Sequence, residues 1–240
     1  MLEIDAYQNN NKERFFLNSN DNYLEYAKDN KDKFIEGIIQ GKSPDDEKDA
    51  VFMAGSPGAG KTEVALGLAE NYDNHVIIDA DAFRTQFPDY NGTNSSAFQK
   101  ACSWLVEQAL KYVLDKGYSF ILDATFAILS AEKNIIRAEK SGFRLTIFYV
   151  YQEPQIAWQF TKEREVAEGR KVLKKTFINA YFKARENIKK VKERHQKIVL
   201  HIIVKDYQSN IAEVHYAADN VKLVLPERYT IEELEEKLDD

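Results

Sequence analysis

One eight-residue stretch constrains the fold of this chain more than any other. Gly55, Ser56, Pro57, Gly58, Ala59, Gly60, Lys61 and Thr62 follow the pattern G-x-x-x-x-G-K-[ST] without a gap. An apolar run suited to a buried strand, residues 50–54, leads into the stretch, and an alanine- and leucine-rich segment, residues 63–70, leads out as a helix. Strand, glycine-rich loop and helix in this order predict a phosphate-binding loop.

The chemistry of this loop predicts a bound nucleoside triphosphate. The glycines let successive backbone N–H groups face an anion, and the N-terminus of the following helix adds partial positive charge. Lys61 is expected to reach the β- and γ-phosphates, and the Thr62 hydroxyl is expected to hold Mg²⁺. The alternative is a glycine turn with an incidental lysine, which the flanking strand and helix disfavour.

Composition excludes several classes of protein. The chain has 240 residues, 44% of them hydrophobic, which fits one packed α/β domain. Its net charge of −6 disfavours nucleic acid as the main partner. No run approaches the ~18 apolar residues of a membrane span, and the polar N-terminus does not resemble a signal peptide. The single cysteine, Cys102, rules out an internal disulfide framework and is predicted to be buried. These features predict a cytoplasmic protein.

The chain is predicted to consist of three parts. Residues 1–48 read as a polar N-terminal helical extension, in which the better of two short helices spans about residues 22–40. Residues 49–225 read as a P-loop kinase-type core with a lid near residues 160–175, and residues 226–240 as a C-terminal helix or tail. The expected strands of the core are residues 51–54, 75–79, 119–123, 144–151 and 197–204, with residues 221–225 as a possible sixth.

Helical patterns alternate with these strands, which predicts an α/β fold with a mostly parallel sheet and helices on both of its faces. In such sheets ligands gather at the carboxyl ends of the strands. The candidate site residues are therefore those that directly follow each strand.

Two carboxylates follow the second predicted strand. Asp79 closes the apolar run and is expected near the sheet, where it would serve the metal side or the substrate. Asp81 lies one step further out and is the candidate general base that accepts the proton of an acceptor hydroxyl. For either residue the alternative is a helix cap, since aspartate is a favoured N-cap residue. Phe83 follows on the same segment and is expected to contact substrate.

The third predicted strand ends at Asp123, and Thr125 follows two residues later. An apolar strand that ends in aspartate is typical of a Walker B segment, in which the carboxylate assists the metal. The pattern is common, and the sequence leaves open whether Asp123 serves Mg²⁺ or, with Thr125, the acceptor.

The predicted lid carries two arginines. Arg164 and Arg170 flank an acidic segment that ends a helix. In phosphoryl transfer, arginines supplied from a lid offset charge on the transferring group. An exposed charged helix with i,i+4 ion pairs would give the same pattern.

Taken together, these residues resemble the zeta-toxin family of small kinases over roughly residues 51–188. The resemblance rests on the phosphate-binding loop, the Ile-Asp-x-Asp-x-Phe segment at residues 78–83, the strand that ends at Asp123, and the two lid arginines. It implies a kinase that transfers phosphate from ATP or GTP, with Mg²⁺, to a sugar hydroxyl of UDP-N-acetylglucosamine. It also implies Asp81 as base, Arg164 and Arg170 as the transition-state clamp, and a toxin restrained by an antitoxin.

One segment departs from the family pattern. The family usually reads Glu-Gly-Thr-Gly-Arg where this chain has residues 123–127, Asp-Ala-Thr-Phe-Ala. The shorter acid and Ala127 remove reach and a positive charge from the acceptor site, and a desolvated arginine–anion contact is worth roughly 1.5–3 kcal/mol. The alternatives to a UDP-N-acetylglucosamine kinase are a kinase for another small hydroxyl substrate, a kinase for a nucleic-acid end, and a regulatory ATPase.

The N-terminal extension is either an autoinhibitory segment or a segment that packs at the sheet edge, and the second is favoured.

Overall fold

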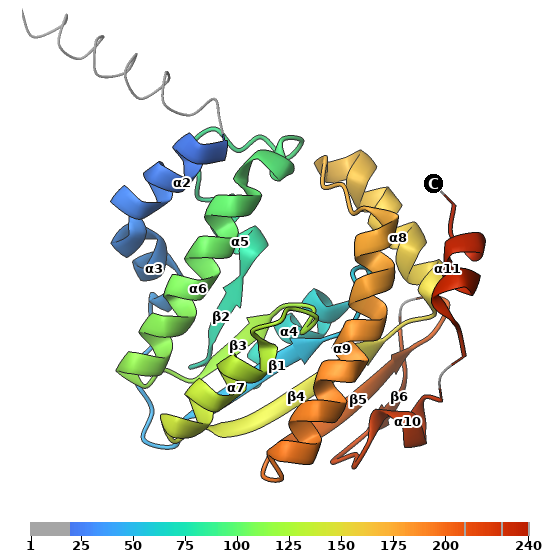
Figure 1. The fold of residues 1–240 in the computed structure, drawn as a ribbon. Helices are drawn as coiled ribbons and strands as arrows, with labels where there is room; N and C mark the ends of the chain where they lie inside the picture. Colours follow the sequence, from blue (N-terminus) through green and yellow to red (C-terminus); the bar gives the residue numbers. More distant parts are fainter. Residues whose placement is uncertain (1–19, 209, 227, 240) are drawn as a thin grey trace, which may run out of the picture.

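In this computed structural model, residues 20–208, 210–226 and 228–239 are described, and they form a three-layer α/β arrangement around one sheet (Figure 1). The sheet has six strands in the order β2-β3-β1-β4-β5-β6. The first five are mutually parallel, and β6 pairs antiparallel with β5. The strands are β1 (Asp49–Ala54), β2 (Val76–Asp79), β3 (Phe120–Asp123), β4 (Arg144–Tyr151), β5 (Val199–Lys205) and β6 (Ile211–His215).

The helices cover both faces of the sheet, as predicted. They are α2 (Asn20–Asp29), α3 (Lys31–Ile39), α4 (Lys61–Ala69), α5 (Ala80–Arg84), α6 (Gln99–Lys116), α7 (Ala131–Lys140), α8 (Pro154–Glu168), α9 (Lys174–Arg194), α10 (Val221–Val224) and α11 (Ile231–Lys237). None of the helices in the described part of the chain is long and apolar enough to cross a membrane.

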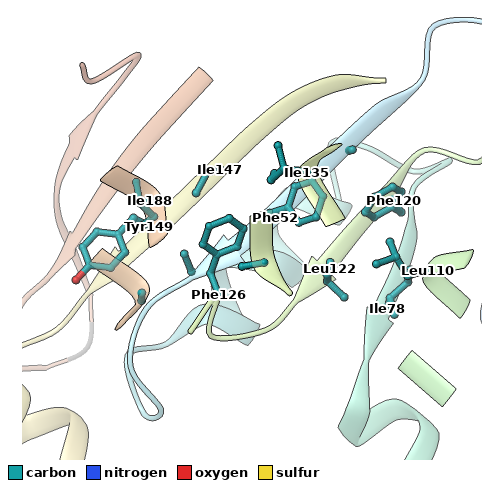
Figure 2. Close-up of a cluster of buried hydrophobic side chains, with 14 of the residues drawn as sticks. Phe52, Ile78, Leu110, Phe120, Leu122, Phe126, Ile135, Ile147, Tyr149 and Ile188 are labelled. Carbon is teal, nitrogen blue, oxygen red and sulfur yellow. The ribbon is translucent and has the colours of Figure 1, made fainter. Parts of the chain in front are cut away.

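Side chains of β1 alternate between two hydrophobic clusters, one on each face of the sheet. Val51 and Met53 join a smaller cluster with α4, whereas Phe52 joins the larger one with α6, α7 and α9. This alternation is the period-two pattern of a strand buried on both faces. Figure 2 shows part of the larger cluster, with Phe52 and Phe126 close together; their ring centroids are 6.1 Å apart.

The sixth strand differs from the sequence prediction. Residues 221–225 were expected to form it, but Val221–Val224 is the short helix α10, which begins where the Asn220 side chain accepts the Lys222 N–H. The sixth strand is instead β6, which follows a tight turn held by the Asp206 carboxylate. Because β6 is an edge strand with an exposed first half, it carries no buried apolar alternation that the sequence pattern could reveal.

The N-terminal helices pack on the core. The single helix expected at residues 22–40 is divided into α2 and α3 at Asn30, whose side-chain amide donates to the Tyr26 carbonyl. Tyr23 packs on Phe87 and Phe98, and Phe34 packs on Phe87. Residues 1–19 lie outside the described residues, and the second short helix expected in residues 1–48 stays a prediction.

Candidate active site

The phosphate-binding loop joins β1 to α4, and backbone atoms of neighbouring segments approach it so closely that it requires glycine at several positions. Gly55, Gly58 and Gly60 all have positive φ. A Cβ on Gly55 would lie 2.3 Å from the Val150 carbonyl oxygen, and one on Gly58 would lie 2.0 Å from the Ala157 carbonyl oxygen. Since these contacts involve backbone, no side chain fits at either position. The loop is therefore wedged between the end of β4 and the beginning of α8.

Lys61 and Thr62 occupy the first turn of α4. The Lys61 ammonium donates to the Ser56 carbonyl at 2.7 Å and thus lies inside the curl of the loop. Desolvation there lowers the pKa of Lys61 to about 8, and Arg170 and Arg164 act in the same direction, against the raising effect of Asp123. The Thr62 hydroxyl donates to the Asp123 carboxylate at 2.6 Å. The structure thus brings the loop together with the end of β3, as a Walker A and Walker B pair requires.

The donor set beside Thr62 fits Mg²⁺. The paired atoms are a hydroxyl and a carboxylate oxygen, the hard oxygen ligands that Mg²⁺ prefers, and Mg²⁺ in nucleotide sites takes only one or two carboxylates because phosphate oxygens complete its shell. No cluster of three or more His, Cys, Asp or Glu side chains that would form an all-protein metal cage occurs among the described residues.

Asp79 and Asp81 have different surroundings. Asp79 is the N-cap of α5, and its carboxylate accepts the Ala82 N–H at 3.2 Å. Burial, followed by the like charges of Asp81 and Asp123, raises the pKa of Asp79 to about 6. Asp81 lies in the first turn of α5, beyond the cap position. The capping role that both residues could have played thus falls to Asp79.

Three arginines surround the carboxylate of Asp81. Arg84 donates to its Oδ1 atom, whereas Arg164, at 2.9 Å, and Arg170 both donate to Oδ2. Burial opposes ionisation of Asp81, but Arg170, Arg84 and Arg164 outweigh it and hold the pKa of this carboxyl below its usual value. The two arginines predicted to act together therefore meet at the predicted base.

The lid consists of the end of α8, the beginning of α9 and the residues between them. Gly169 ends α8 with a φ of 61°, and the Glu168 carbonyl accepts the Ser95 hydroxyl at 2.9 Å. A Cβ on Gly169 would lie 1.9 Å from the Thr93 carbonyl oxygen. The segment predicted to be a lid thus contacts the loop that follows α5.

A cleft with a volume of about 610 Å³ lies between the phosphate-binding loop and α8. Its size falls within the range of small-ligand sites. The residues that line it are Gly58, Gly60, Lys61, Thr62, Glu63, Phe160, Glu163, Arg164, Ala167 and Glu168.

The loop after β3 is held to both the phosphate-binding loop and α9. The Thr125 carbonyl accepts the Gly55 N–H at 3.2 Å, and the Asn187 amide donates to the Phe126 carbonyl at 2.9 Å. Phe126 stands where the family usually has its second glycine and has a φ of 59°. Its ring is buried against Phe52, which offsets the backbone strain of that conformation.

Phe83 lies elsewhere than expected. Its side chain is fully buried and packs on Phe34 of α3, with ring centroids 6.3 Å apart. The helical phase of α5 explains this placement, because Phe83 and Arg84 face the core while Asp81 faces the lid. We therefore treat Phe83 as a core residue rather than a substrate contact.

Sequence reasoning missed three residues that shape the site. Arg84 is one, although its position three residues after Asp81 in a helix is a recognised ion-pair spacing. Asn187 and Thr93 are the others, and no sequence signal announces them because each acts through contacts with distant segments.

The phosphate-binding loop, the strand-end carboxylates and the arginine-bearing lid define a P-loop phosphotransferase of the kinase class. The chain belongs to the Zeta toxin family, whose family model matches residues 35–219.

Toxin PezT of Streptococcus pneumoniae is 24% identical to the chain over 136 residues, which cover 53% of this chain and 54% of PezT. The chain therefore matches about half the length of that relative.

Solved structures show the same fold. One from the PezAT chromosomal toxin–antitoxin system of Streptococcus pneumoniae has a TM-score of 0.61 at 19% identity, covering 90% of this chain and 91% of that one. The AvrRxo1-ORF1:AvrRxo1-ORF2 structure with ATP has a TM-score of 0.59 at 12% identity, with coverages of 91% and 80%. At these identities the likeness establishes the fold alone.

Proposed function

We propose that this chain transfers the γ-phosphate of ATP or GTP to a hydroxyl of a small molecule, with a nucleotide-sugar such as UDP-N-acetylglucosamine as the first acceptor to test. The observation that carries the proposal is the convergence of Arg164 and Arg170 on one oxygen of Asp81, next to the phosphate-binding loop. A base and two phosphate-clamping cations within contact of each other are what in-line phosphoryl transfer to a hydroxyl requires.

Each residue has a defined part in the proposed reaction. The loop N–H groups and the Lys61 ammonium bind the β- and γ-phosphates, while Thr62 and Asp123 would hold Mg²⁺. When bound, Mg²⁺ neutralises charge on the β- and γ-phosphate oxygens. Arg164 and Arg170 offset negative charge on the transferring group, and the Oδ2 atom of Asp81 takes the proton of the acceptor hydroxyl.

We assign the base to Asp81 because of where its carboxylate points. Its Oδ2 atom meets the lid arginines, which line or border the nucleotide cleft. The Asp79 carboxylate is instead occupied by the backbone of α5. Asp79, Asp123 and Thr125 lie around the same edge of the sheet, and we propose that Thr125 and the second Asp123 oxygen take part in acceptor binding.

The acceptor itself is open to a second candidate. Ala127 stands in place of the arginine that the family uses on the nucleotide-sugar, and the adjoining Ile128 and Leu129 are exposed. These residues favour an acceptor whose part near Ala127 carries no charge. Another small hydroxyl compound is therefore the alternative to UDP-N-acetylglucosamine.

An antitoxin protein is the proposed partner. The support is membership of the Zeta toxin family, together with the similarity in fold to a structure from the PezAT toxin–antitoxin system. The cytoplasmic location predicted from the sequence stays a prediction, as does the expectation that nucleic acid is not a partner.

The test is transfer of labelled γ-phosphate from Mg-ATP and Mg-GTP to UDP-N-acetylglucosamine and, separately, into a bacterial metabolite extract. The wild-type chain is expected to label an organic hydroxyl compound. Asp81→Asn is expected to lower kcat by roughly 10²–10⁴-fold with nucleotide binding retained, and Lys61→Ala to abolish transfer in a folded protein. Label found only in inorganic phosphate would support a regulatory ATPase, and unchanged turnover of Asp81→Asn would assign the base elsewhere.

A further inference from the structure

Arg84 is a buried charge that the reaction described above leaves without a task. Its side chain is 2% exposed, although it carries a guanidinium. Within the described residues two hydrogen bonds hold this group: Nη1 donates to Asp81 Oδ1, and Nη2 donates to Gln99 Oε1 of α6 at 3.1 Å. The buried Nε atom meets no hydrogen-bond partner within the described part of the chain.

This arrangement is costly for stability. Burying a charged group is unfavourable unless a partner of opposite charge meets it, and a well-packed apolar side chain at such a position is often as stable or more stable. Among the residues that the structure describes, Asp81 is the anion that forms an ion pair with Arg84. The placement of Arg84 is therefore explained by what it does to Asp81.

The two oxygens of Asp81 are divided between two sets of arginines. Oδ1 contacts Arg84, which belongs to the same helix and lies in the core. Oδ2 contacts Arg164 and Arg170, which belong to the lid and are 39% and 34% exposed. The first contact is fixed within the core, whereas the second depends on a closed lid.

We propose that Arg84 is a positioning residue that holds Oδ1 of Asp81 so that Oδ2 stays aimed at the acceptor hydroxyl when the lid arginines move to the phosphate. This inference rests on the proposed role of Asp81 as base. In this structure all three arginines share the carboxylate. With a γ-phosphate present, Arg164 and Arg170 gain a more highly charged partner, and Arg84 alone remains to orient Asp81 and to keep it ionised.

The charged and titratable groups around Asp81 define what a pH profile will report. The charged ones are Arg84 of its own helix, Arg164 and Glu168 of α8, Arg170 of the segment after α8, and Asp79 at the end of β2. Cys102 of α6 is titratable, but burial raises the pKa of its thiol and keeps it neutral. Removal of Arg84 takes one cation away from this set, so the carboxyl becomes easier to protonate. Because a base works only when ionised, the acid limb of the kcat–pH curve should then move to higher pH.

The test compares Arg84→Gln, Arg84→Lys and Gln99→Leu with the wild-type chain, using labelled γ-phosphate transferred from Mg-ATP into a bacterial metabolite extract. Arg84→Gln is expected to lower kcat by roughly 10–100-fold, as misplacement of a base does. The KM for ATP should change less than about threefold, and the acid limb should shift upward. Arg84→Lys should recover a large part of kcat and return the acid limb toward its wild-type position. Gln99→Leu removes the second hydrogen-bond acceptor of the Arg84 guanidinium. It should lower kcat without changing the KM for ATP.

A matched control separates positioning from stability. Arg185 of α9 is also a buried arginine, 8% exposed, and donates to the Leu225 carbonyl far from Asp81 in the chain. Arg185→Gln should lower the melting temperature but leave the acid limb in place. A folded Arg84→Gln protein, or a Gln99→Leu protein, with wild-type kcat and acid limb would overturn the proposal.

The double variant Asp81→Asn/Arg84→Gln separates this proposal from the one on which it rests. If Arg84 acts through Asp81, the double variant should be no slower than Asp81→Asn alone. Turnover that survives Asp81→Asn would overturn the base assignment and the inference together. A large defect in Asp81→Asn with none in Arg84→Gln would overturn the role of Arg84 alone.

Discussion

At the scale of single residues, the site is built from charges whose ionisation the fold alters. Lys61 is enclosed by the phosphate-binding loop, which lowers its pKa to about 8. Burial, and after it the nearby carboxylates of Asp81 and Asp123, raises the pKa of Asp79 to about 6. The pKa of Asp81 is shifted in the opposite direction, because its three arginines outweigh the effect of burial. Neighbouring aspartates in one segment thus differ in the pH range over which each is charged.

The shifted pKa of Lys61 predicts that nucleotide binding takes up protons in mildly alkaline solution. Because the pKa of Lys61 is about 8, its side chain is largely neutral at pH 8.5 in the chain without nucleotide. Phosphates that enter the loop favour the charged form and draw the proton back. Titration calorimetry of ATP in two buffers of different ionisation enthalpy should show proton uptake at pH 8.5 and little at pH 6.5. Lys61→Met should abolish the difference between the buffers, and persistent uptake in that variant would assign it to another group.

The raised pKa of Asp79 predicts that its charge destabilises the fold at neutral pH. The folded state favours the neutral carboxyl, because its pKa there lies above the unfolded value of 3.8. The free energy of unfolding therefore falls as the pH rises through about 6 and Asp79 becomes charged. Asp79→Asn removes that charge and keeps a side-chain oxygen that can cap α5. The melting temperature of this variant should exceed that of the wild type at pH 7.5, and the gain should vanish near pH 4.

Asp206 provides the control of opposite sign for the Asp79 variant. The N–H group of Asn210 holds the pKa of its carboxyl below the usual value; desolvation acts against it, and the N–H of Gln208 acts in the same direction as that of Asn210. Asp206→Asn should therefore lower the melting temperature at pH 7.5. A gain for Asp79→Asn that did not depend on pH would show that the charge is not its cause.

At the scale of elements, the sequence predicts what local pattern encodes. Residues 144–151 are expected as a strand and form β4 with the same bounds, and the expected ranges for β2, β3 and β5 differ from the structure by one or two residues. Apolar runs buried on both faces make these strands recognisable. The edge strand β6 and the contact between Gly169 and Thr93 lack such a signal, because one is exposed and the other joins segments distant in sequence.

The same reasoning separates the parts of the site that could be predicted from those that could not. The proximity of Lys61, Thr62 and Asp123 can be predicted, because their motifs fix both the loop and the strand end. The partner of Asp81 inside the core, Arg84, depends on the packing of α5 against α6, which is a tertiary feature. The burial of Phe83 could not be predicted for the same reason, since five residues are too few to show which face of a helix packs on the core.

Substitution of Gly169 is predicted to slow turnover, because it would displace the segment that carries Arg164 and Arg170. Gly169→Ala would place a methyl group 1.9 Å from the Thr93 carbonyl oxygen, so the lid must move away from the loop after α5. A displacement of about 1 Å at Arg164 and Arg170 is enough to cost roughly 10²-fold in kcat. Steady-state kinetics with Mg-ATP should show this loss.

Gly41→Ala is the matched control for the lid variant. Gly41 has a similar φ of 73°, but nothing lies within 4 Å of its added Cβ. Gly41→Ala should lose about 1 kcal/mol of stability from the left-handed backbone conformation alone, while kcat stays at the wild-type level. Equal kcat values for the two variants would place Gly169 outside the closure mechanism.

At the scale of the whole molecule, the sheet gathers the candidate site residues at the carboxyl ends of neighbouring strands. The carboxyl ends of β1, β2 and β3 supply the phosphate-binding loop, α5 with its aspartates, and Asp123, while the connection after β4 supplies the lid (Figure 1). Adjacent parallel strands bring these segments together although up to about a hundred residues separate them. The helices α2 and α3 lie on the far side of α6 from the lid (Figure 1).

The position of α2 and α3 predicts that the N-terminal extension stabilises the core and does not inhibit the enzyme. Tyr23 and Phe34 are 6% and 3% exposed and pack on aromatic side chains of the core. Among the described residues, none that lines the cleft comes from this segment. Phe34→Ala should therefore lower the free energy of unfolding by roughly 3–5 kcal/mol, whereas Lys33→Ala, at an exposed position of the same helix, should change it by less than about 0.5 kcal/mol.

Deletion of residues 1–40 should give an insoluble or strongly destabilised protein whose remaining soluble fraction binds ATP with unchanged affinity. A soluble truncated protein with tighter ATP binding and faster phosphate transfer would instead show that the extension restrains the site, because covering a site from within the same chain acts through effective concentration and is relieved on removal.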